Sequence, residues 1–450
     1  MHFHHHPQPM TSGSIPGHLI RYAIPAVLGD LFQVTYNTVD SIVVGRFAGA
    51  NALAAVGVAN PLMNIAMFFI IGMGIGASVL MSQFYGAGDR RGLKREFSTA
   101  LFTGLGLSLI VSALFLALVH PLLRLCNTPA EIFADTAAYL RIVACCFLFT
   151  GLYNVLAAAL KSIGDTRAPL LCLVAGSVCN VGLDIWFVKE LEMGVAGAAC
   201  ATVISQALSA ALCALLIRRF AEPLRLGRGD LVVEKALLRR TIHYSYATAL
   251  QQAGVYVGKL LVQGMVNPLG VSAIAAFNAV NRVDDYALIV ERDIGSGIMV
   301  MTAQNHGARK PERMLGGLRA GLVMEALYGA AVSAGVFCLA TPLVSLFVDA
   351  GETQVIQLGT RYLHLMGFFY FMPGITNGLQ GYMRGVGKMN LTMYVTYTQM
   401  LTRTLFTWLL IGSMGMDAVP LACAAGWLVM MVWEVALIIL WRKQGRLLDA

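Results

Sequence analysis

Two acids and two amides lie on the apolar stretch 19–46, where ionisable side chains are costly and therefore candidates for function. They are Asp30, Gln33, Asn37 and Asp40, spaced 3, 4 and 3 residues apart. At 3.6 residues per turn, this spacing places all four on one face of a helix. Such a polar stripe is unfavourable against lipid, so we expect it to face other helices.

A second group lies in the apolar stretches 169–188 and 194–217 and consists of Asn180, Asp184 and Thr202. The expected directions of these helices and of the helix 19–46 place Asp40, Asp184 and Thr202 in the outer half of a membrane. Two carboxylates, an amide and a hydroxyl at one depth predict a site for a proton or for Na⁺, which prefers oxygen ligands. Nearby carboxylates disfavour double ionisation, so the pair could load and release a cation. Asn180 and Thr202 could instead only satisfy hydrogen bonds between helices.

A third group is the dense set of charges at 282–293, which includes Asp284, Asp285 and Glu291. Glu291 is flanked by apolar residues, and we predict it as a further cation or substrate contact. Lys259 and Arg403 are candidate partners for these acids. An ion-paired structural network is the alternative interpretation.

The composition identifies the environment of these groups. The 450 residues are 57% hydrophobic and 12% charged, whereas soluble domains are usually about 25% charged. Basic residues account for the net charge of +8, but they lie in short loops, a pattern typical of membrane orientation. Nucleic acid is therefore not an expected partner. No metalloprotease, nucleophile-elbow or P-loop motif is present, which disfavours an enzyme.

We predict twelve transmembrane helices and an all-α integral membrane fold, since one span needs about 20 apolar residues. The spans are 19–46, 53–84, 97–124, 136–160, 169–188, 194–217, 241–266, 271–305, 317–347, 357–383, 391–413 and 418–441. Lysine and arginine concentrate in alternate loops. This predicts a multi-pass protein of the bacterial inner membrane with both termini in the cytoplasm.

The two halves of the chain repeat each other. Shifting the sequence by 221 residues aligns Gln83–Gly88 with Gln304–Arg309, and Gly49–Ala55 with Gly270–Ala276. With two more residues of offset, Leu160–Asp165 aligns with Met383–Lys388. Six helices is an even number, so the repeats are parallel, and a central cleft is expected between them.

The repeat and the loops predict five regions. These are a disordered tail at 1–18 that contains a histidine tract, a first lobe at 19–217, a cytoplasmic linker at 218–240, a second lobe at 241–441 and a cytoplasmic tail at 442–450.

From about Ile20 to Arg442 the chain resembles the multidrug and toxic compound extrusion (MATE) family. The resemblance rests on Gln33–Gly45 (QVTYNTVDSIVVG), the repeated Gln-x-x-Gly-Ala loop and the repeated basic-x-x-Gly loop after the fourth and tenth spans. It implies efflux by alternating access, driven by an inward flow of H⁺ or Na⁺.

The resemblance also implies roles for particular residues. Asp40, Asn180, Asp184 and Thr202 look like the amino-terminal cation site of one branch of the family. Gln33, Tyr36, Asn37 and Glu291 are candidate cation or substrate contacts. The acidic cluster that other branches have in their seventh and tenth helices is absent, because these spans carry Gln251, Gln252, Tyr370 and Asn377.

The expected protein is thus a monomer that exports small cationic or amphiphilic organic compounds and needs no cofactor beyond its coupling ion. A flippase for lipid-linked precursors is the alternative. Its expected mark is a cationic cavity, for which Lys259, Arg282, Arg292 and Arg403 would be the candidates.

Overall fold

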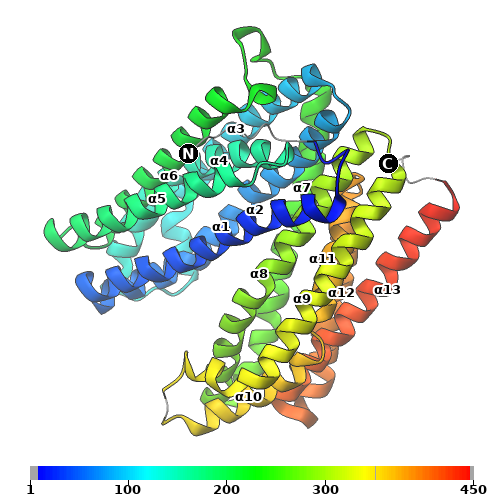
Figure 1. Ribbon diagram of the computed structural model, residues 1–450. Coiled ribbons are helices and arrows are strands. Elements are labelled where there is room, and N and C mark those ends of the chain that lie inside the picture. The colour runs from blue at the N-terminus through cyan, green and yellow to red at the C-terminus, as the bar shows by residue number, and fades with distance from the viewer. Residues whose placement is uncertain (1–8, 350, 446–450) are drawn as a thin grey trace. The chain divides into compact units, whose positions relative to one another are not determined.

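The computed structural model describes residues 9–349 and 351–445, and within these ranges it is helical without strands. The helices of each half lie side by side along their length (Figure 1). In the first half they are α1 (Ile15–Val43), α2 (Ala50–Gly86), α3 (Arg90–Leu125), α4 (Ala130–Ser162), α5 (Arg167–Asp184) and α6 (Gly194–Phe220). In the second half they are α7 (Lys235–Val266), α8 (Val271–Gly307), α9 (Pro311–Ser345), α10 (Thr353–Gly367), α11 (Phe371–Gly385), α12 (Met389–Met414) and α13 (Ala418–Lys443).

Each predicted span has a helical counterpart, but the span 357–383 is not one helix. It is divided into α10 and α11 by a turn at Phe368–Tyr370. Pro373 follows the break and has no N–H to donate to a continuous helix. The hydrogen bonds around the break span three residues, as in tight turns. Phe369 N donates to Met366 O at 2.8 Å, and Met372 N donates to Phe369 O at 2.9 Å.

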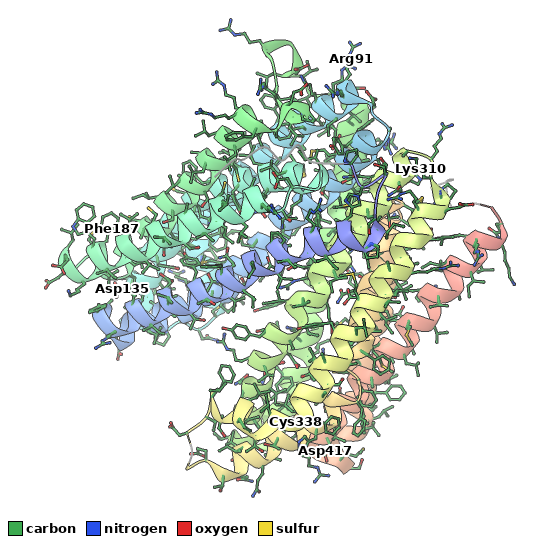
Figure 2. All side chains as sticks on the ribbon, viewed as in Figure 1. Arg91, Asp135, Phe187, Lys310, Cys338 and Asp417 are labelled. Carbon is green, nitrogen blue, oxygen red and sulfur yellow. The ribbon has the colours of Figure 1, made fainter. Side chains whose placement is uncertain are left out.

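Seven helical stretches among the described residues are long and apolar enough to cross a membrane. They include α2 to α6 with the turn that follows α5, α9, and the run Met389–Lys443. Charges occupy the ends of the helices. Figure 2 shows Arg91 at one end of the first half and Asp135 at the other, and likewise Lys310 and Asp417 at opposite ends of the second half.

The duplication is visible in the backbone. The left-handed φ of Gly49 (89°) recurs at Gly270 (100°), and that of Gly164 (89°) recurs at Gly387 (85°). Gly88 (72°) corresponds to Arg309 (55°). The turns close with the same bonds, because Asp89 N donates to Phe84 O at 3.0 Å and Lys310 N donates to Asn305 O at 2.9 Å. Equivalent turns therefore end equivalent helices in the two halves.

The chain forms two compact units whose boundaries lie inside helices. The first unit contains Ile24–Ala249, and the second contains Met10–Ala23 together with the chain from Leu250 onward. The first turns of α1 thus belong to the second unit, and the first turns of α7 belong to the first. The predicted division at 218–240 differs from this one, because each half exchanges its leading helical turns.

The predicted disordered tail at 1–18 is wrong for its described part. Met10 is only 2% exposed, and α1 begins at Ile15. Met10 N donates to Gln304 Oε1 at 2.8 Å, and Arg313 Nη2 donates to Met10 O at 3.0 Å. These hydrogen bonds hold the segment before α1 in place, although its sequence has no apolar periodicity from which an ordered structure could be predicted. The histidine tract lies in residues 1–8, outside the described residues.

The segment before α7 docks in the equivalent way on the first unit. Val232 N donates to Ser98 Oγ at 3.0 Å, and Glu234 N donates to Thr99 Oγ1 at 3.2 Å. Lys94 pairs with Asp230 at 3.4 Å. Under the 221-residue shift, Leu231–Glu234 corresponds to Met10–Gly13, so both leading segments bind the start of the other half's third helix.

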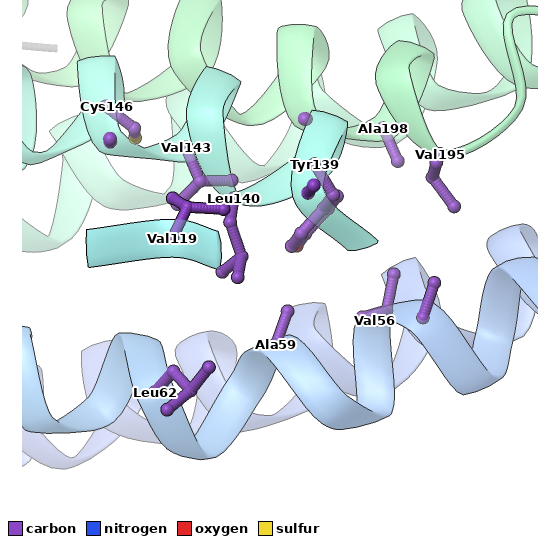
Figure 3. Close-up of a cluster of buried hydrophobic side chains, with 14 of the residues drawn as sticks. Val56, Ala59, Leu62, Val119, Tyr139, Leu140, Val143, Cys146, Val195 and Ala198 are labelled. Carbon is purple, nitrogen blue, oxygen red and sulfur yellow. The ribbon is translucent and has the colours of Figure 1, made fainter. Parts of the chain in front are cut away.

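The core of the first unit lies where α2, α3, α4 and α6 meet (Figure 3). Val56, Ala59 and Leu62 of α2 face Leu140 and other residues of α4 there. Glycines allow α2 to approach α7 closely, since a Cβ on Gly72 would lie 2.8 Å from Ala249 N and one on Gly76 would lie 2.7 Å from Ser245 N.

Candidate functional site

The candidate site lies in the first unit, where α1, α5 and α6 carry the predicted cation ligands. Asp184 is the last residue of α5, and a π-helical turn at Ile185–Glu190 follows it. A second π-helical turn, Val44–Ala48, follows α1 four residues after Asp40. The two turns pack against each other. Wide turns of this type occur mainly at functional sites.

Asn180 links two elements of the site. Its amide is oriented so that both its groups are bonded: Nδ2 donates to Asp184 Oδ2 at 2.6 Å, and Oδ1 accepts from Thr202 N at 3.1 Å. Asn180 and Asp184 are both fully buried. The amide thus holds the Asp184 carboxyl in place and ties α5 to α6.

Thr202 contributes mainly through its backbone. Its side-chain Oγ1 donates to Ala198 O at 3.0 Å, the preceding turn of α6, while its N–H donates to Asn180. The Thr202 side chain also interacts with Tyr36 of α1. The residue therefore connects α6 to both α1 and α5.

The carboxyl groups of Asp40 and Asp184 lie close enough to interact electrostatically. Two neighbouring buried carboxyl groups disfavour double ionisation, so one of them retains a proton unless a cation is bound. Asp40 Oδ1 and Asp184 Oδ1 are buried and have no hydrogen-bond partner among the described residues. Buried oxygens without donors favour a cation as their partner. The pair can hold one proton, or it can offer its oxygens to a hard cation.

Tyr139 of α4 is a neighbour of this pair that the sequence did not reveal. It is buried at 4% exposure and interacts electrostatically with both Asp40 and Asp184. Its phenol lies in the apolar cluster of the first unit. Because tyrosines are common in apolar spans, no spacing or motif distinguishes Tyr139 from a packing residue.

The other predicted contacts lie apart from this pair. Gln33 Nε2 donates to Asn37 Oδ1 at 3.3 Å on an exposed part of α1. Glu291 belongs to the second unit and is fully buried in α8. Within the first unit, the structure thus brings Tyr36, Asp40, Asn180, Asp184 and Thr202 together and leaves Gln33 and Asn37 outside the cluster.

The charges of α8 are partly paired. Lys259 Nζ lies 3.7 Å from Asp285 Oδ1, a pairing that the sequence suggested. Asp284 Oδ1 accepts from Tyr370 Oη at 2.5 Å. Tyr370 lies in the turn between α10 and α11, so the helix break places its phenol against α8.

The second unit contains a buried amide network in place of an acidic cluster. Gln251 Nε2 donates to Gln380 Oε1 at 2.9 Å and to Thr396 Oγ1 at 2.7 Å. Arg384 Nη2 donates to Gln251 Oε1 at 3.1 Å. Arg384, the basic residue of the second basic-x-x-Gly loop, thus holds the side-chain amides of Gln251 on α7 and Gln380 on α11 by charge-assisted bonds.

A protein-family comparison matches the chain to MatE over residues 25–186 and 247–409, one match in each half. The "Probable multidrug resistance protein YpnP" of Bacillus subtilis is 27% identical over 383 residues, covering 84% of both chains. The "Probable multidrug resistance protein NorM" of Thermotoga maritima is 24% identical over 396 residues, covering 86% of this chain and 83% of the relative.

Solved structures share the fold. An outward-facing multidrug resistance MATE family transporter of the MOP superfamily superposes with a TM-score of 0.90 at 20% identity. The superposition covers 96% of this chain and 97% of that one. The two relatives from Bacillus subtilis and Thermotoga maritima are named for multidrug resistance, which does not favour a flippase for lipid-linked precursors.

Proposed function

Because the chain belongs to the MatE family of membrane transporters, we propose that it is a secondary active antiporter. It exports small cationic or amphiphilic organic compounds in exchange for H⁺ or Na⁺ by alternating access. The observation that carries this proposal is the neighbouring pair of carboxyl groups of Asp40 and Asp184, with Asn180 and Thr202 beside it.

The coupling step follows from the chemistry of the pair. With a cation bound, one positive charge offsets the repulsion between two carboxylates in a medium of low dielectric constant. When the cation leaves, the two carboxylates repel each other. Either α1 then moves away from α5, or water enters and hydrates the carboxylates. Binding of the cation therefore favours one arrangement of α1, and its release favours another.

Asn180 and Thr202 position this step. The Asn180 amide holds Asp184 on α5 and α6, so the movable partner is Asp40 on α1. Tyr36 lies one turn before Asp40 and reaches Thr202. A movement of α1 would therefore change the contact between the Tyr36 phenol and α6. Exchange follows if the organic substrate binds better to the arrangement without the cation.

We also propose that the protein is monomeric in the bacterial inner membrane, with both termini in the cytoplasm. The alternation of basic and acidic loops along the helices supports this orientation. A reporter that is active only in the cytoplasm, fused after Gln444, should be active. The same reporter inserted in the loop at Asn127–Pro129 should be inactive.

The test of the proposed function is accumulation of a fluorescent organic cation in efflux-deficient bacteria. Cells that express the protein should accumulate less dye than cells that do not. Asp184→Asn and Asp40→Asn should each abolish the difference, and comparison of media with and without Na⁺ identifies the ion. The matched control is Asp135→Asn, which removes an exposed carboxylate from α4.

Two results would contradict the proposal. One is wild-type protein, present in the membrane, that does not lower accumulation of any organic cation in a panel. The other is full efflux by the double variant with asparagine at both positions, since such a protein has no carboxylate left at the site proposed to couple transport.

A further inference from the structure

A second pair of buried carboxyl groups lies in the second unit. Glu291 projects from α8 and Glu325 from α9, and both are fully buried. A Cβ built on Gly374 of α11 would lie 3.0 Å from Glu325 Oε2 and 3.4 Å from Glu291 Cδ. The two side chains therefore converge on one point of α11.

Gly374 and the helix break create the space for this pair. Any larger residue at this position would contact the Glu325 carboxyl oxygen and also Glu325 Cβ, at 3.3 Å. The turn at Phe368–Tyr370 ends α10 and starts α11 at Phe371, which places Gly374 in the first turn of the new helix. The discontinuous helix thus provides a cradle for two carboxyl groups.

The oxygens of this pair are without protein partners. Both Oε atoms of Glu291 and both of Glu325 are buried with no hydrogen-bond donor within the described chain. Buried polar atoms are nearly always bonded, so four orphaned oxygens at one place call for a bound partner. Buried carboxyl groups of this kind hold a proton or a cation, because an uncompensated charge is unfavourable there.

The neighbouring ionisable groups supply no positive charge. Glu291 interacts with Asp284, and Glu325 interacts with Glu291. Tyr328 of α9 and Tyr370 also interact with Glu291, but the Tyr328 hydroxyl donates to Ala287 O at 2.9 Å and the Tyr370 hydroxyl donates to Asp284. Among these groups none can neutralise the pair, so the positive charge must come from outside the protein.

The two acid pairs are not copies of each other. Under the repeat, Glu291 corresponds to Ile70 and Glu325 to Gly104, while Asp40 corresponds to Leu261. Glu291, Glu325 and Asp40 therefore occupy positions that carry no acid in the other unit. The second pair cannot be explained as a remnant of the duplication.

We infer that Glu291 and Glu325 form a second cation-loading site, so that one transport cycle exchanges two cations, one from each unit, for one molecule of substrate. The inference rests on the proposed antiport. A proton and Na⁺ share the required chemistry, since each is a small monovalent cation that oxygen atoms bind. Glu325 thereby joins the site residues, although the sequence interpretation did not select it.

The test counts cations released when substrate binds. Purified protein in weakly buffered detergent solution receives an organic cation that the wild type exports. A pH dye counts protons released, and radiolabelled Na⁺ counts sodium displaced. Wild type should release two cations per substrate bound. Asp184→Asn, Glu291→Gln and Glu325→Gln should each release half as many, and the combined Asp184→Asn and Glu325→Gln variant none.

The control variant is Asp285→Asn, which removes an exposed carboxylate from α8 and should release as many cations as the wild type. Unfolding temperatures identify any variant that fails to fold, and Glu291→Gln and Glu325→Gln provide independent tests. Full release by both glutamine variants would overturn the second site. Unchanged release by Asp184→Asn with reduced release by Glu325→Gln would instead overturn the proposed role of the first site alone.

Discussion

At the scale of single residues, the amide of Asn180 and the backbone of Thr202 position the site, whereas the two aspartates bind the cation. The carboxyl groups of Asp40 and Asp184 carry the exchangeable charge. Among the described residues, the Asn180 amide donates the hydrogen bond to Asp184 Oδ2, and Thr202 supports Asn180 through its N–H. Positioning and cation binding can therefore be separated by mutation.

We expect Asn180→Ala to impair transport far more than Thr202→Val. Asn180→Ala removes the donor from a buried carboxyl oxygen, which should lower the free energy of unfolding by roughly 1–3 kcal/mol. Thr202→Val retains the backbone N–H that Asn180 accepts. Dye efflux and thermal unfolding of both variants check this expectation. Equal losses in the two variants would show that the Thr202 hydroxyl is itself a ligand.

The linker residue Asp230 predicts a pH dependence outside the membrane. The N–H of Gly227, 2.9 Å away, and the Lys94 ammonium lower the pKa of Asp230 below its usual value. A group with a lowered pKa in the folded state stabilises that state above its unfolded pKa, and its contribution is lost as the pH falls through the folded pKa. Docking of the linker should therefore persist at neutral pH and weaken only in strong acid.

Limited trypsin digestion measures this docking at Arg225 and Arg228. Asp230→Asn should raise the rate of cleavage at these sites at pH 7. Glu222→Gln, which breaks only an exposed pair with Arg90, should not. An equal rate in wild type and Asp230→Asn would show that the Asp230 carboxylate does not hold the linker.

At the scale of elements, the glycines of α2 decide how closely α7 can pack. A side chain at Gly76 would collide with the backbone and side chain of Ser245. The equivalent Gly297 of α8 lies against Tyr22 of α1, where a Cβ would be 3.2 Å from the ring. In both units, therefore, a glycine at the equivalent position allows two helices to pack closely.

We expect Gly76→Val to lower the free energy of unfolding by roughly 1–3 kcal/mol, because the helices must separate to admit the side chain. Gly57→Val is the matched control on the same helix, since a Cβ there meets nothing within 4 Å. Thermal unfolding in detergent compares the two. A Gly76→Val protein as stable as the Gly57→Val protein would contradict close packing of α2 and α7.

Most of the helices and most of their ends could be predicted from the sequence, because long apolar runs form the helices and repeated glycine turns end them. The break at Phe368–Tyr370 could not, since a proline such as Pro373 is equally compatible with a kinked single helix. Neither π-helical turn has a sequence signal. For the site, helical spacing placed Asp40, Asn180 and Asp184 correctly on their own helices, but contacts between helices depend on packing that spacing does not encode.

Glu325 shows a different kind of omission. It is a lone acid within the apolar run Gly321–Ala331, so the rule that identified Asp184 applies to it equally. What the sequence could not show is its partner, because Glu291 is 34 residues away and on another helix. The pair exists only through the convergence of α8 and α9 on Gly374.

At the scale of the whole molecule, each half is completed by a segment of the other. Met10–Ala23 belongs to the second unit, and the turns of α7 up to Ala249 belong to the first. Any rearrangement of one unit must therefore act on α1 and α7, since both helices have residues in each unit.

We expect Arg313→Gln to free the segment before α1. Arg313 donates to the carbonyl oxygens of Met10 and Gly13, and no apolar run holds these residues otherwise. Hydrogen exchange at the amide of Met10 should become faster in this variant. Arg319→Gln, on an exposed face of α9, should leave the rate unchanged. Slow exchange in Arg313→Gln would show that the remaining bonds with Gln304, Asn305 and Lys310 suffice.

The exchanged leading segments also constrain how the protein is made. During translation, the surface of α2 at Gly72 and Gly76 stays uncovered until the start of α7 leaves the ribosome, after all six helices of the first half. Met10–Ala23, synthesised at the outset, finds its place only when α8 and α9 exist. Domains usually fold in the order of synthesis. Here each unit includes a segment from the other half of the chain, so neither half can complete its packing without residues of the other.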